Sequence, residues 1–219
     1  MFPLQSMIPC LLHEDDHLLV VHKPPGWNTH APSPTGGEGT YDWLRHREPR
    51  WATLALIHRL DKETSGALLF AKTALANRSL TDQFTRRAVR KRYLLFTDRP
   101  PREPRFVVRS CLVRSGERYL SRPPHAGGDL AETKFRVLDR AEVVQWLTKA
   151  DLSPTGLSVL EAVPLTGRTH QIRVHAADRG LSILGDTLYG GSPAPRVCLH
   201  AAGLGLTHPA SGQPTLLEP

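Results

Sequence analysis

The sequence predicts an α+β protein with a mixed, mostly antiparallel central sheet and flanking helices. Short apolar and β-branched runs recur along most of the 219 residues, which is typical of strands joined by turns. Helical spacing, by contrast, is confined to Thr73–Thr85 and His170–Arg179. A chain of this length can bury one substantial core, so we expect a single domain over residues 1–219.

Composition and charge narrow the class of protein. With 40% hydrophobic and 22% charged residues, the chain is in the ordinary globular range. It has no apolar run long enough to span a membrane and no secretion signal at its start, so we expect a cytoplasmic protein. The net charge of +7 favours a polyanionic partner. Three cysteines without CxxC spacing predict reduced, mostly buried thiols.

The first half of the chain predicts three strands separated by polar connections. His17–His22 is an apolar strand that leads into a long Pro- and Gly-rich loop, Pro24–Gly39. Leu54–Leu60 and Ala67–Ala71 are the next two strands, and Asp61–Gly66 connects them tightly. This connection is polar although it lies between apolar runs.

The middle of the chain predicts one helix and then a set of hairpins. Leu75, Leu80 and Phe84 give Thr73–Thr85 the spacing of an amphipathic helix. Five basic residues follow in Arg86–Arg92, directly before a strand that begins at Tyr93. The remaining predicted strands of this region are Phe106–Val113, Thr133–Leu138 and Leu157–Val163.

The last quarter of the chain predicts a second helix and two strands. Thr166–Thr169 reads as a turn with Thr169 as the N-cap of a helix over His170–Arg179, which Gly180 would end. On that helix His170, Arg173 and Ala177 share a face. Val197–Ala201 and Leu204–Thr207 are the final predicted strands.

Several reaction classes have no motif here. The sequence contains neither a phosphate-binding P-loop nor a GxGxxG turn, and it lacks a GxSxG nucleophile elbow. Its 11 histidines show none of the spacings of a metal site. We therefore expect no nucleotide cofactor and no metal, with most histidines in structural roles.

The segment His58–Gly66, with the sequence HRLDKETSG, carries the densest set of reactive side chains. From the residues alone Asp61 can be a turn-capping side chain or a catalytic carboxylate. The segment resembles the HRLDxxTSG signature of the RluA-type pseudouridine synthases, in which this aspartate is the essential catalytic carboxylate.

Other segments resemble the same family in the same order, from about Leu11 to Pro209. They are DDHLLVVHKPPG at 15–26, KRY at 91–93, LTGRTHQIRVH at 165–175, ILGDTLYG at 183–190 and LHA at 199–201. The resemblance implies the pseudouridine synthase fold with an active-site cleft. It also implies isomerisation of uridine in RNA without a cofactor.

The resemblance assigns roles residue by residue. Asp61 would be the catalytic carboxylate, either attacking C1′ or abstracting the 2′ proton, and both routes stay open. Arg173 would be its partner arginine, and Tyr93 would offer its ring and hydroxyl to the flipped base. Substrate-binding roles are expected for His58, Arg59, Arg90, Lys91, Arg92, Arg168 and Leu199.

Two features differ from the common family pattern. We expect no S4-type RNA-binding domain before the catalytic part, and we expect the catalytic domain itself to recognise the RNA. The bulky Trp27 replaces a small residue in its loop and puts the RNA target in doubt. We expect ribosomal or transfer RNA as partner, no DNA and no membrane, and a monomer.

One alternative remains, a non-catalytic RNA-binding or RNA-chaperone protein on the same fold, which would not need Asp61. A glycosidase with two carboxylates is disfavoured, because only Glu63 lies close to Asp61 in the sequence.

Overall fold

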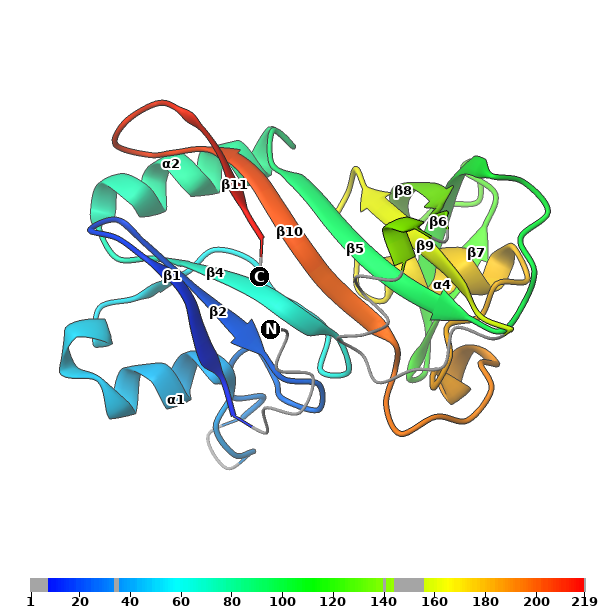
Figure 1. Cartoon of the computed structure of the whole chain (residues 1–219), viewed down its shortest axis with the longest axis horizontal. Coiled ribbons are helices and arrows are strands. Elements are labelled where there is room, and N and C mark those ends of the chain that lie inside the picture. The colour runs from blue at the N-terminus through cyan, green and yellow to red at the C-terminus, as the bar shows by residue number, and fades with distance from the viewer. Residues whose placement is uncertain (1–7, 34–35, 140, 144–155, 219) are drawn as a thin grey trace. The chain divides into compact units, whose positions relative to one another are not determined.

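The computed structural model describes residues 8–33, 36–139, 141–143 and 156–218. These residues form two compact units (Figure 1). We call residues 91–200 the continuous unit, and residues 8–90 together with 201–218 the split unit. The chain passes from one unit to the other within β5 (Arg90–Thr97) and within β10 (Leu199–Thr207). A single catalytic domain over the whole chain stays a prediction.

The split unit contains strands in the order β1, β2, β4, β10, with β3 beside β4 and β11 beside β10. Both β2 and β4 are buried along their whole lengths, as expected for strands that read as continuous apolar runs. The bounds are β1 Cys10–Glu14, β2 Leu18–Lys23, β3 Ala55–Leu56, β4 Ser65–Ala71 and β11 Pro214–Leu217.

Three helical segments complete the split unit. Helix α2 (Ala74–Thr85) begins at Thr73, whose hydroxyl accepts a hydrogen bond from the Ala76 N–H. Its Leu80 packs with Leu69 of β4 in the core. Helix α1 (Thr40–Arg47) and a 3₁₀ turn (Pro49–Trp51) precede β3.

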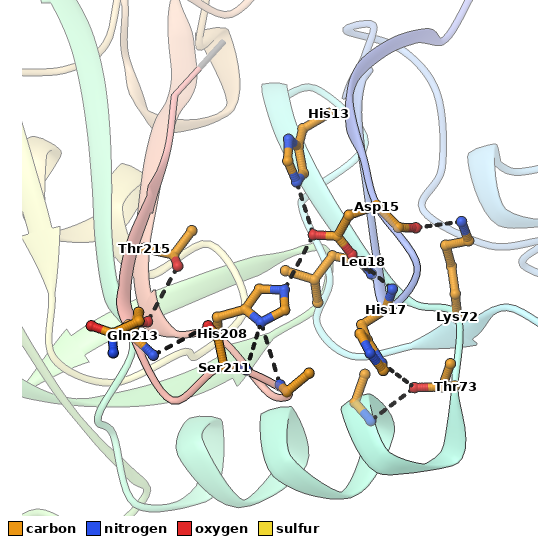
Figure 2. A network of polar contacts seen from close by, with 12 residues as sticks. His13, Asp15, His17, Leu18, Lys72, Thr73, His208, Ser211, Gln213 and Thr215 are labelled. Atoms are coloured by element: carbon orange, nitrogen blue, oxygen red, sulfur yellow. Dashed lines mark hydrogen bonds and ion pairs between the residues drawn. The ribbon is translucent and has the colours of Figure 1, made fainter.

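Asp15 ties the two hairpins of the split unit together (Figure 2). Its Oδ1 accepts hydrogen bonds from the N–H groups of His17 and Leu18, both at 2.7 Å, which closes the β1–β2 turn. Its Oδ2 lies 3.1 Å from His13 Nε2 and 3.2 Å from Nε2 of His208, which follows β10. Burial opposes ionisation of Asp15, but these hydrogen bonds outweigh it and lower its pKa.

The continuous unit contains strands in the order β5, β9, β8, β6, β7, and each neighbouring pair is antiparallel. Helix α4 (Gln171–Asp178) and a 3₁₀ turn (Thr187–Tyr189) accompany them. The strand bounds are β6 Arg105–Ser115, β7 Arg118–Arg122, β8 Asp129–Val137 and β9 Ser158–Pro164. Many antiparallel strands with few helices confirm the predicted fold class.

Several predicted element boundaries were wrong. The two strands predicted at Val197–Ala201 and Leu204–Thr207 are the single strand β10 (Leu199–Thr207). The strand predicted at Leu54–Leu60 shrinks to Ala55–Leu56. The hydroxyl of Thr29 donates to the Leu60 carbonyl at 2.9 Å and accepts from the Leu60 N–H at 3.0 Å, which occupies both backbone groups of that residue. The N-cap of α4 is His170, with φ of 56°, and not Thr169.

Two other expectations are confirmed, the end of α4 at Gly180 and the free state of the cysteines. Gly180 ends α4 in the left-handed conformation, with φ of +72°. Cys111 and Cys198 are buried free thiols, and Cys10 is partly buried. Within the described ranges, no helix has the length and apolar character needed to cross a membrane.

Candidate active site

Asp61 lies in the split unit on the turn that leads into β4. Its carbonyl accepts a hydrogen bond from the Thr64 N–H at 3.1 Å, and the side chains of Thr64 and Ser65 are buried at the end of the turn. Gly66 follows with φ of +117°, and a Cβ there would come within 2.3 Å of the Ala201 carbonyl oxygen. The TSG part of the motif thus fixes where the turn joins the sheet, and Asp61 stays partly exposed.

Lys23 anchors this turn through its side-chain ammonium group. Its fully buried side chain donates hydrogen bonds from Nζ to the carbonyls of Pro24, Trp27 and Lys62 at 2.9, 2.7 and 3.0 Å. The Gly26 N–H also donates to the Lys62 carbonyl, at 2.8 Å. One ammonium group therefore joins the KPPG loop to the segment that carries Asp61.

The charge of Lys23 is coupled to the same turn. Burial lowers the pKa of Lys23 to about 7, while the negative charges of Glu63 and Asp61 oppose that shift. The KPPG segment belongs to the family resemblance, but the sequence alone assigns Lys23 no role. The available signal was a lysine at the end of a strand that begins with four apolar residues.

His58 and Arg59 precede Asp61 in the same unit. His58 Nε2 accepts a hydrogen bond from the Leu69 N–H at 3.0 Å, and its ring stacks on Phe84 with centroids 5.2 Å apart. These contacts hold His58 against β4 and α2, and its predicted contact with substrate stays a prediction. Arg59 is exposed to solvent, which suits a side chain that meets RNA.

Tyr93 and helix α4 lie on the same face of the sheet in the continuous unit. Tyr93 pairs with Ala162, and Ala162 pairs with Phe135 of β8, so these residues share a face. Thr133, two residues before Phe135 on that face, hydrogen-bonds with His175 and Gln171 of α4 at 2.9 Å each. The structure thus places Tyr93 on the helix-covered face that also carries Arg173.

Arg173 is buried, and Asp186 holds its guanidinium group. Nε donates to Oδ2 at 2.7 Å and Nη2 to Oδ1 at 2.8 Å, which is a two-point ion pair. The guanidinium carbon lies 5.1 Å from the ring centre of Tyr189, whose hydroxyl is 2.8 Å from His170 Nδ1. The GDTLYG segment therefore supports the HQIR segment, a role that sequence analysis did not assign.

The other predicted substrate contacts are distributed over both units. Lys91 donates to the Thr166 carbonyl at 2.7 Å, and Arg92 lies 3.7 Å from Glu161. Arg168 pairs with Asp129 at 3.1 Å and is exposed, whereas Leu199 is buried. Arg90 is exposed at the start of β5, in the split unit.

The candidate residues therefore fall into two local groups. His58, Arg59, Asp61 and Arg90 belong to the split unit, and Lys91, Arg92, Tyr93, Arg168, Arg173 and Leu199 belong to the continuous unit. The pairing of Asp61 with Arg173 stays a prediction. A search of the described parts of the chain finds no group of His, Cys, Asp or Glu side chains arranged to hold a metal ion.

The described residues thus include a turn-borne aspartate anchored by a buried lysine, and an arginine held by a second aspartate. The family model described as RNA pseudouridylate synthase matches residues 17–178. The chain belongs to this family, as the resemblance implied.

Curated relatives and solved structures agree with this membership. The chain is 34% identical to proteins named "Ribosomal large subunit pseudouridine synthase C" from Yersinia pestis and Escherichia coli, over 97% of its own length. It spans about 66% of the length of these relatives. The human protein RNA pseudouridylate synthase domain containing 1 is 25% identical, with a TM-score of 0.75 over 96% of this chain and 82% of that one. A second human protein, domain containing 4, has the same identity and a TM-score of 0.69, over 95% of this chain and 87% of the other.

Proposed function

We propose that this protein is an RNA pseudouridine synthase that isomerises uridines in large-subunit ribosomal RNA. The observation that carries the proposal is Asp61, which lies in an intact HRLDKETSG turn tied to Lys23 through the Lys62 carbonyl. The names of the similar bacterial proteins favour ribosomal RNA over transfer RNA.

In the proposed reaction the bond between uracil N1 and C1′ breaks, the base turns, and a bond forms between C5 and C1′. The proton on C5 leaves and N1 gains one, so the reaction involves no net oxidation or hydrolysis. We therefore propose that it needs no metal, nucleotide or redox cofactor. Asp61 acts as an ionised carboxylate, either as nucleophile at C1′ or as base at C2′.

The base must leave the RNA stack before Asp61 can reach its sugar, at a cost of a few kcal/mol. Tyr93 offers an aromatic face to the extruded uracil, and Arg59 is exposed beside Asp61 to hold a phosphate or fill the vacated stack. In this proposal Arg173, whose guanidinium plane is fixed by Asp186, supplies an oriented positive charge that positions the Asp61 carboxylate. We propose that the protein does this as a cytoplasmic monomer.

The test is to map pseudouridines in ribosomal and transfer RNA from cells with and without the gene. We expect at least one large-subunit position to lose its pseudouridine and to regain it when the wild-type gene is returned. Loss of a transfer RNA position instead would correct the substrate. Unchanged maps, together with no product from purified protein and unmodified RNA, would favour the non-catalytic alternative.

A further inference from the structure

The sheet of the continuous unit has a second face that carries exposed basic residues. Along β6, exposed Arg105, Val107 and Arg109 alternate with buried Phe106 and Val108. The buried side contacts helix α4, because Leu112 and Ala131 pack with Val174. The exposed side chains consequently point to the opposite face.

Strand register gathers the exposed residues of three strands on this face. Lys134 of β8 lies opposite Val107, while Leu120 and Arg118 of β7 lie opposite Val113 and Ser115. We call the following exposed set the open face: Arg105, Val107, Arg109, Val113, Arg118, Leu120, Arg122, Leu130 and Lys134.

The open face has a large excess of positive charge. Glu132 lies 3.9 Å from Arg109, at the edge of ion-pair distance. Within the described part of the chain, no ion pair is found for Arg105, Arg118, Arg122 or Lys134. Arg136, opposite Arg105 in the β6–β8 register, is already paired with Glu142 at 2.9 Å and with Glu161 at 3.6 Å, so the uncompensated charge is that of the open face itself. A polyanionic partner would neutralise it.

We propose that the open face binds the sugar–phosphate backbone of RNA. Arginine and lysine neutralise phosphates, and the valine and leucine side chains between them can contact sugars. The defined set contains no aromatic residue on which a base could stack, so the contact is independent of sequence. A second copy of the chain does not fit, because pairing two such faces would bring arginines against arginines.

This face is opposite the one that carries Tyr93 and α4, so it would hold a part of the RNA other than the reacting uridine. The choice of RNA as the polyanion rests on the proposed function. The binding itself can be measured without turnover.

The test compares two charge-matched triple variants. Arg118→Gln/Arg122→Gln/Lys134→Gln removes three open-face charges, while Arg78→Gln/Arg102→Gln/Arg114→Gln removes three exposed charges elsewhere. The probe is a double-stranded RNA of arbitrary sequence, and its affinity is measured by fluorescence anisotropy at several salt concentrations. We expect the open-face triple to weaken binding and to reduce the slope of log K against log salt by about 2 to 3, and the control triple to change the slope by less than about 1.

Two further measurements make the outcome decisive. Arg118→Lys/Arg122→Lys should keep the wild-type slope, because lysine also neutralises phosphate. Circular dichroism should show both triples folded, since every substituted side chain is exposed.

Equal slopes for wild type and the open-face triple would overturn the proposal, and so would equal losses in both triples. A dimer in sedimentation that only the open-face triple dissociates, or binding of poly-glutamate as tight as that of RNA, would also overturn it. A failure of the proposed function appears separately, as absence of pseudouridine from wild-type reactions on unmodified RNA.

Discussion

Arg173 and Asp186 form a buried two-point ion pair, with N–O distances of 2.7 and 2.8 Å, that fixes the plane of the guanidinium group. Lysine has a single ammonium group and cannot be held in one plane in this way. Asp186 therefore determines the direction in which Arg173 presents its charge. Variants of the pair should distinguish the effect of that charge on the reaction rate from the effect of its orientation.

Arg173→Lys should slow isomerisation at every pH, including where Asp61 is ionised, because a flexible point charge cannot orient a carboxylate at the sugar. The measurement is single-turnover isomerisation against pH for wild type, Arg173→Lys and Arg173→Ala. A lysine variant with near wild-type rates would show that charge alone suffices.

Asp186→Asn should destabilise the fold by about 3 to 5 kcal/mol, because it leaves the buried guanidinium of Arg173 without a counter-charge. Urea unfolding measures the loss. Asp178→Asn, on the last residue of α4, is the control, because that carboxylate accepts one hydrogen bond near the surface, from Ser121. A similar loss in both variants would argue against a special role for the pair.

Asp61→Asn should keep the fold and RNA binding but reduce turnover by more than about a hundredfold, roughly 2.7 kcal/mol of barrier. The amide preserves the shape of the side chain and removes the charge that the chemistry requires. Pseudouridine formation in unmodified RNA is the readout, with Glu63→Gln as the neighbouring control. Asp61 would lose its assignment if the asparagine variant retained a larger fraction of the rate.

Lys23→Met should lower the free energy of unfolding by about 2 kcal/mol or more and also slow isomerisation. The substitution leaves the carbonyls of Pro24, Trp27 and Lys62 without their shared donor. Lys62→Met is the matched control, since only the backbone carbonyl of Lys62 takes part and its side chain is exposed. Equal stability and activity in both variants would contradict the anchoring role of Lys23.

His175 should make the protein less stable as the pH falls from 6.5 towards 4. Burial lowers its pKa to about 4, so in this window the unfolded state binds a proton that the folded state does not. The free energy of unfolding therefore rises with pH, by about 3 kcal/mol at most across the window.

Denaturation of wild type and His175→Gln at several pH values checks this effect. The glutamine variant should show the shallower dependence, whereas exposed His125→Gln should follow wild type. Parallel curves for all three proteins would contradict the assignment to His175.

The sequence predicted those elements whose pattern is local. β2, β4 and α2 appear close to their expected ranges because apolar runs and the Thr73 cap determine them. Helix α1 was missed because it buries only Thr40 and Leu44 and so has little apolar periodicity. The strand at Leu54–Leu60 was overestimated because its end depends on Thr29, which is distant in the sequence.

The same distinction applies to the candidate site. The motif identified Asp61 because its signature is contiguous. The roles of Lys23 and Asp186 depend on contacts that form only after folding, with Lys62 in one case and Arg173 in the other. A sequence pattern can mark such residues but cannot state which atoms they hold.

The passage of the chain through β10 has a consequence for synthesis on the ribosome. β4 pairs with β10, so the sheet of the split unit stays incomplete until residues 201–217 have been translated, long after β4 itself. At ordinary elongation rates that delay is on the order of ten seconds. During this time the apolar edge of the nascent β4 is paired only at Phe70 and Ala71, with β3, and its remaining length is of the kind that aggregates or recruits chaperones. The strands β5 to β9 of the continuous unit follow one another in the sequence, so this unit can fold before β10 is available to pair with β4.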